Sequence, residues 1–229
     1  MLSKKSSQKP NYDGEFVAAI RANVSKVIDL LDKKDAGLSK RVNTFASRFD
    51  FVVESIEEKI RKDEVFRAVF AKDPGKQKIH ENIAARFIEQ MQGVVGFQQL
   101  GHDALVVFGG RVETRKAVLA AGAGATAKTI DFEWISNGRK IYASHKYTKQ
   151  SGGAQDNQYK DLQLFIREAN ESNLKDTYFL AIADGDYYLT TDRGTGGTKM
   201  ERLKDISNKR NVFALSIDEL EDWIKTHCA

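Results

Sequence analysis

Residues 129–149 read TIDFEWISNGRKIYASHKYTK, and this stretch decides the fold. Two runs rich in β-branched and aromatic residues, Thr129–Ile135 and Lys140–Thr148, flank Ser136-Asn137-Gly138. An Asn-Gly pair between two such runs is a strong β-hairpin signal, because both residues tolerate the positive φ that a tight turn requires. The stretch therefore predicts two antiparallel strands joined by a short turn.

From Ala104 onward, on both sides of the hairpin, the chain alternates between helical and strand patterns. We expect, in chain order, a strand at Ala104–Phe108, a helix at Ala154–Ala169, strands at Tyr178–Ala183 and Val212–Leu215, and a last helix that begins at a capping box of Ser216 and Glu219. The Ala/Gly-rich residues Ala117–Ala127 fit either a loose loop or a small-residue helix.

The pattern before the hairpin, from Gly14 to Gln99, is helical. One apolar stripe contains Phe16, Ile20, Val24, Val27 and Leu31, a second contains Phe45, Phe51, Val52, Ile56 and Ile60, and a third, after Asp73-Pro74-Gly75, contains Ile79, Ile83, Phe87 and Met91. We expect a flexible basic tail at 1–13, a helical region at 14–100 and a core at 101–229. The helix at 76–92 should pack on the core, so the two regions could form one continuous domain.

Composition limits the classes of protein that remain. Lysine and arginine number 36 against 32 acids, a net charge of +4, which is compatible with a polyanionic partner but does not require one. The single cysteine excludes an internal disulfide, and four scattered histidines do not make a zinc site. No apolar run approaches the length of a membrane span, and no apolar segment follows the basic N-terminus. We therefore expect a cytoplasmic protein without a membrane partner.

The hairpin would place Asp131 and Lys146 side by side on neighbouring strands. A carboxylate supplies the oxygen ligands that Mg²⁺ prefers, and an adjacent ammonium can orient a water or stabilise charge on a phosphate. Hydrolysis of a phosphodiester needs both, because the anionic substrate repels a nucleophile until a cation neutralises it. A solvated cross-strand ion pair is the alternative interpretation.

The order Thr129–Glu133, Ile141–Lys146, Gly-rich turn and helix resembles the core of PD-(D/E)XK nucleases, type II restriction endonucleases in particular. The resemblance covers roughly Glu81 to Trp223. It implies an α/β fold with a mixed, mostly antiparallel-cored sheet flanked by helices, and a helical region packed on it. It also implies Mg²⁺-dependent hydrolysis of double-stranded DNA by a homodimer, because cutting both strands of a symmetric site needs two centres.

The chain departs from the family at Ser144, where the resemblance implies a second metal-binding acid. Asp161, or less well Asp156, could supply this acid from the following helix, which is the alternative that we favour. Glu133 could supply it instead, since it lies two residues after Asp131 and so on the same strand face. In the third alternative the site is disabled, and the protein binds DNA without cutting it. A repair nuclease that recognises DNA structure is a further, weaker interpretation.

Other polar residues are candidates for supporting roles. Glu81 could support the metal through water, although an exposed helix glutamate is the more common explanation. The amide-rich segment 150–158 follows the expected catalytic strand and could read adenine edges, or it could be a polar turn with a helix cap. His145 should point to the sheet face opposite Lys146. The candidate DNA contacts are Lys149, Gln150, Gln155, Gln158, Arg111 and Arg115, with Lys116 beside them.

Overall fold

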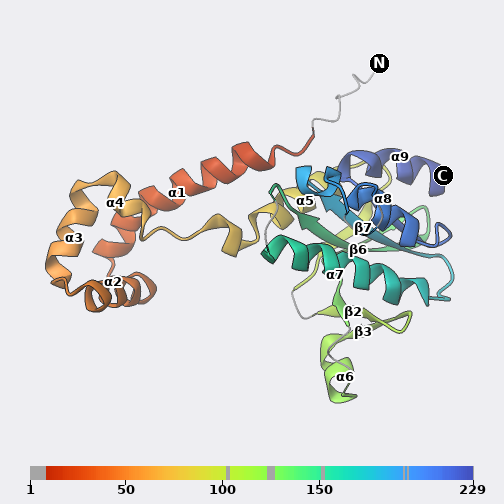
Figure 1. The fold of residues 1–229 in the computed structure, drawn as a ribbon, viewed down its shortest axis with the longest axis horizontal. Helices are drawn as coiled ribbons and strands as arrows, with labels where there is room; N and C mark the ends of the chain where they lie inside the picture. The colour runs from red at the N-terminus through yellow and green to blue at the C-terminus, as the bar shows by residue number, and fades with distance from the viewer. Residues whose placement is uncertain are drawn as a thin grey trace. The chain divides into compact units, whose positions relative to one another are not determined.

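The computed structural model describes residues 9–101, 104–122, 127–150, 153–192, 194 and 196–228 (Figure 1). The chain divides into two compact units. One contains Asn11–Ile83, and the other contains the chain from Ala84 onward together with Lys9 and Pro10. None of the helices in the described part of the chain combines the length and apolar character that crossing a membrane requires.

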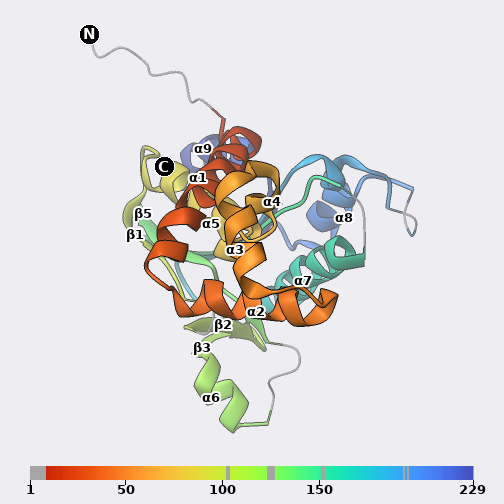
Figure 2. The same cartoon turned by 90° about the vertical axis from the view of Figure 1, so that its left-hand side faces the viewer.

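The unit at Asn11–Ile83 is helical, as its apolar periodicity predicts (Figure 2). Its helices are α1 (Tyr12–Asp32), α2 (Ala36–Phe49), α3 (Val53–Lys62), α4 (Glu64–Ala68), the 3₁₀ helix η1 (Pro74–Gln77) and the start of α5 (Ile79–Glu89). Val27, Leu38, Val42 and Ile60 are almost fully buried and form its core with their neighbours.

The second apolar stripe of the sequence divides between two helices, which corrects the expectation of one continuous stripe. Helix α2 ends at Phe49 because Asp50 adopts the left-handed conformation, with φ of 56°, and α3 starts at Val53. Phe51 and Val52 lie in the connection and are 56% and 65% exposed.

The second unit contains a five-stranded sheet in the order β1-β5-β6-β7-β8. The strands are β1 (Val95–Gln99), β5 (Phe132–Ser136), β6 (Arg139–Tyr147), β7 (Thr177–Asp184) and β8 (Val212–Leu215). The mixed α/β sheet flanked by helices is confirmed. We expected a mostly antiparallel core, but two of the four strand pairings, β6 with β7 and β7 with β8, are parallel. They are parallel because helical crossovers connect these strands. Strand β1 also lies in a range expected to be helical.

The predicted hairpin is present as β5 and β6, with Ser136 opposite Arg139 across the turn. Asn137 and Gly138 have φ of 45° and 77°, so both turn residues occupy the region that Asn and Gly tolerate best. The register pairs Phe132 with Ala143 and so brings the residue before Phe132 next to Ser144.

Helices cover both faces of the sheet (Figure 1). Helix α7 (Gly153–Asn170) buries Leu162, Phe165 and Ile166 on one face, together with α8 (Lys199–Ile206). The later part of α5 and helix α9 (Ile217–His227) cover the other face. Because side chains alternate along β6, Ser144 and Lys146 share the face that α7 covers, and His145 points to the opposite face.

A small sheet of order β3-β2-β4 precedes the hairpin. Its strands are β2 (Leu105–Phe108), β3 (Arg111–Thr114) and β4 (Lys128–Thr129), and the short helix α6 (Arg115–Ala120) follows β3. The turn between β2 and β3 touches α7: the Gly110 N–H donates to the Glu168 carbonyl at 3.0 Å, and a Cβ on Gly110 would lie 2.5 Å from the Glu171 backbone. The alternatives for Ala117–Ala127 resolve as helix up to Ala120, and 123–126 lie outside the described residues.

Candidate active site

Asp131 is held between two segments of backbone. Its N–H donates to the Ala143 carbonyl at 2.8 Å, and its own carbonyl accepts from the Leu100 N–H at 2.8 Å. Only 7% of the residue is exposed. A buried carboxylate needs charged or hydrogen-bonding partners to offset the loss of water, so its surroundings indicate how its charge is compensated.

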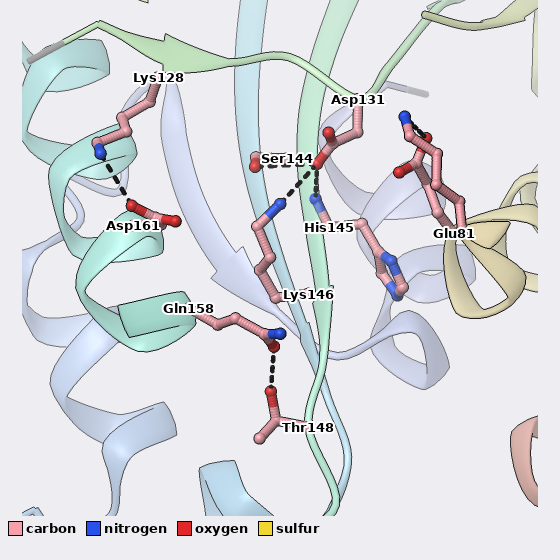
Figure 3. Close-up of polar contacts among 10 residues, drawn as sticks. Glu81, Lys128, Asp131, Ser144, His145, Lys146, Thr148, Gln158 and Asp161 are labelled. Atoms are coloured by element: carbon pink, nitrogen blue, oxygen red, sulfur yellow. Dashed lines mark hydrogen bonds and ion pairs between the residues drawn. The ribbon is translucent and has the colours of Figure 1, made fainter. Parts of the chain in front are cut away.

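One oxygen of the Asp131 carboxylate, Oδ2, accepts three hydrogen bonds (Figure 3). The donors are Ser144 Oγ at 3.1 Å, the His145 backbone N–H at 2.8 Å and Lys146 Nζ at 3.2 Å. Among the described residues, every hydrogen bond that the carboxylate accepts reaches Oδ2. This arrangement fixes the orientation of the side chain and leaves Oδ1 as the oxygen that could ligate a cation.

Lys146 and Ser144 reach Asp131 from the same face of β6. The Lys146 side chain keeps 23% of its surface exposed while its ammonium contacts Asp131. Ser144 is almost fully buried. Ser144 occupies the position where the family resemblance implies an acid, and its hydroxyl orients the Asp131 carboxylate.

Asp161 lies on α7, the helix that borders this face of β6, but its carboxylate bonds to Lys128 of β4 at 2.8 Å (Figure 3). The side chain is 46% exposed. The predicted anchoring of the helix by Leu162, Phe165 and Ile166 is confirmed, since all three are fully buried. Because the Lys128 hydrogen bond uses Asp161 Oδ1, Asp161 could act as the displaced acid through Oδ2 or after its carboxylate leaves Lys128.

Glu133, the rival candidate, lies on β5 and pairs with Lys140 of β6 at 3.0 Å. Both candidate acids are therefore neutralised by a lysine in this structure. Within the described ranges, no three His, Cys, Asp or Glu side chains come close enough together to hold a metal ion.

The carboxylate oxygens of Asp131, Glu133 and Asp161 are of the chemical kind that magnesium prefers. Mg²⁺ usually retains several waters and binds proteins through one or two carboxylates. Asp131 Oδ1 could supply one oxygen, and Glu133 or Asp161 could supply a second.

The remaining predicted residues are spread over several elements. Glu81 lies in the first turn of α5 and pairs with Lys78 at 3.2 Å. Arg111 is exposed on β3, and Arg115 begins α6. Lys149 and Gln150 are exposed after β6, Gln158 accepts a hydrogen bond from Thr148 Oγ1 at 2.7 Å, and the Gln155 side chain lies outside the described part. The roles of these residues in catalysis and DNA binding stay predictions.

His145 points away from Lys146, as predicted, and takes part in a buried network. Its Nε2 lies 3.0 Å from Asp184 Oδ2, and Asp184 Oδ1 accepts from the Ile217 N–H at the start of α9. The network stabilises the position of the same residue whose backbone N–H donates to Asp131. We did not predict Asp184, and the only sequence signal was an acid directly after a buried strand.

No protein-family model matches the chain, and no curated protein matches it significantly. Among solved structures, it is similar to protein VC1899 from Vibrio cholerae, with 13% sequence identity and a TM-score of 0.28. The alignment covers 96% of this chain and 56% of that chain, so this chain spans little more than half the length of the other. A likeness this weak carries no argument about fold or function.

Proposed function

We propose that the protein is a Mg²⁺-dependent endonuclease that hydrolyses DNA phosphodiester bonds, as a type II restriction endonuclease at a specific double-stranded site. The observation that supports this proposal is the convergence of Lys146 Nζ and Asp131 Oδ2, 3.2 Å apart, with Asp131 Oδ1 left available. A positioned carboxylate next to the ammonium of a partly exposed lysine side chain is the arrangement that phosphodiester hydrolysis requires.

Each side chain has a distinct task in this proposal. Lys146 orients the attacking water and interacts with the phosphate oxygens, for which its exposed surface is suited. Ser144 and the His145 N–H hold the Asp131 carboxylate in place before substrate arrives. A magnesium ion on Asp131 would neutralise phosphate charge and lower the pKa of a bound water.

The connectivity around the site also supports the proposal. Asp131 directly precedes β5 and Lys146 lies in β6, the two strands of the antiparallel hairpin, and β6 is followed by a crossover helix and the parallel strand β7. This is the order of elements that the resemblance to PD-(D/E)XK nucleases implies, although order alone does not establish an activity.

The test is incubation of the full-length protein with plasmid and phage DNA, with Mg²⁺ or with a chelator. Discrete fragments that depend on Mg²⁺ are the expected result. A Lys146→Ala variant should give none, whereas Lys175→Ala, which removes an exposed lysine before β7, should cut like the unmodified protein. No cleavage under any ionic condition would contradict the proposal.

A DNA-binding protein with a disabled site is the second candidate, and a specific observation favours it. Ser144 replaces the expected acid, and both substitute acids are paired with lysines. Intact but retarded DNA in the same experiment would support this candidate. Cleavage confined to branched or gapped DNA would instead support a structure-specific repair nuclease.

A further inference from the structure

Helix α2 differs in charge from the other long helices of its unit. Its sequence, AGLSKRVNTFASRF, contains three cations and no acid, whereas α3 contains three glutamates in ten residues. The exposed polar residues of α2 carry hydroxyl, amide or cationic groups: Ser39, Lys40, Asn43, Thr44, Ser47 and Arg48. A face with donors and cations but no carboxylate is complementary to a polyanion.

A cavity of about 460 Å³ lies beside this helix. Its lining includes all three cations of α2, Lys40, Arg41 and Arg48, and among its lining residues, all of them described, there is no aspartate or glutamate. No described acid forms an ion pair with Lys40 or Arg48. Arg41 is held in place by the Phe70 carbonyl, which accepts from its Nη2 at 3.1 Å.

Three phenylalanine rings also line the cavity. Phe45 lies 4.7 Å from Phe49 and 5.3 Å from Phe70 between ring centroids, so the rings form one aromatic group. Phe49 remains 52% exposed although it is apolar. Cations around an exposed ring are a combination with which proteins bind single-stranded nucleic acid, because the phosphates meet the cations and an unpaired base stacks on the ring.

We propose that α2 and this cavity bind single-stranded DNA, with Lys40 and Arg48 on the phosphates and an unpaired base against Phe49. The inference rests on the proposed function in that DNA is the substrate. Duplex DNA would use the cations but not the rings, since its base faces are already stacked. The unit would thus bind an unpaired segment of DNA in addition to the duplex site that the proposed nuclease cuts.

Binding of labelled oligothymidylate by the full-length protein, measured by fluorescence anisotropy in a chelator, tests the inference. Phe49→Ala should weaken binding of the single strand roughly tenfold and leave duplex binding unchanged. Lys40→Gln with Arg48→Gln should weaken binding and reduce the slope of log affinity against log salt by about 1.4. The control is Arg21→Gln with Lys26→Gln, an equal loss of charge at exposed positions of α1, which should bind like the unmodified protein.

Three results would overturn the inference. These are unchanged single-strand binding by Phe49→Ala, equal weakening of single-strand and duplex binding by Phe49→Ala, and weakening by the α1 control equal to that by Lys40→Gln with Arg48→Gln. Circular dichroism of each variant checks that the fold is retained. A parallel cleavage assay of the unmodified protein separates the two proposals. If the protein cuts DNA but the α2 substitutions do not change single-strand binding, only this inference is refuted. If the α2 substitutions weaken single-strand binding but the protein cuts no DNA, only the proposed nuclease activity is refuted.

Discussion

In the proposed function, the carboxylate of Asp131 holds the cation and the ammonium of Lys146 acts on the phosphate. We expect Asp131→Asn and Lys146→Ala each to lower Mg²⁺-dependent cleavage by about a hundredfold or more, because each removes a charge that acts on the phosphate or its cation. Asparagine keeps the size of the Asp131 side chain, so the melting temperature of Asp131→Asn should change little. Plasmid cleavage at matched protein concentration is the measurement, with Asp205→Asn, an exposed position on α8, as the control. Full cleavage by either site variant would show that the site is wrongly assigned.

The second acid is also a question at the residue scale. If Asp161 has taken over the role that Ser144 cannot fill, Asp161→Ala should eliminate cleavage and Glu133→Ala should reduce it much less. Ser144→Glu should then partly rescue Asp161→Ala, because either carboxylate could reach the same ion. Single-turnover cleavage rates distinguish the cases. If Glu133→Ala is the inactive variant, Asp131 and Glu133 are the two metal-binding acids. If the unmodified protein is inactive and the single substitution Ser144→Glu produces cleavage, the natural site is disabled.

At the scale of elements, the capping box of α9 predicts a pH-dependent contribution to stability. The pKa of Glu219 lies below its ordinary value of 4.5: burial acts to raise it, but the Lys204 hydrogen bond and the Ser216 N–H lower it more. A carboxylate with a lowered folded-state pKa stabilises the fold above pH 4.5, and this contribution disappears as the pH falls through the folded-state pKa. We expect Glu219→Gln to cost about 0.5–1 kcal/mol at neutral pH and progressively less as the pH falls below 4.5.

Urea unfolding at several pH values measures this difference. The control is Asp205→Asn, which should show no such pH-dependent loss relative to the unmodified protein. A cost for Glu219→Gln that stayed constant down to pH 3 would exclude the ionised cap as its cause.

At the scale of the whole molecule, a type II enzyme should act as a homodimer. One centre cuts one strand, so concerted cleavage of a symmetric site requires two chains. We expect supercoiled plasmid to become linear without accumulation of the nicked form. In sedimentation, the complex with a single-site duplex should have the mass of the duplex plus two chains. Accumulation of nicked circles by a monomeric species would contradict the dimer and favour the repair nuclease.

Local patterns in the amino-acid sequence determined much of this fold. Asn137-Gly138 located the hairpin, the apolar spacing of Leu162 and Phe165 located the buried face of α7, and Ser216 with Glu219 located the start of α9. Each signal arises within a few residues and depends on backbone preferences or helical periodicity. The alternation of side chains along β6 also predicted correctly that His145 and Lys146 would face opposite sides.

Only the tertiary structure decided which charges meet. The pairing of Asp161 with Lys128, and that of His145 with Asp184, joins residues 33 and 39 positions apart, which no local pattern can report. The strand β1 was likewise decided by its pairing with β5. The sequence determined which residue types could support phosphodiester chemistry. Which of these charged side chains pair with one another depends on strand register and helix packing, because an ion pair forms only where the fold brings both partners within a few ångströms.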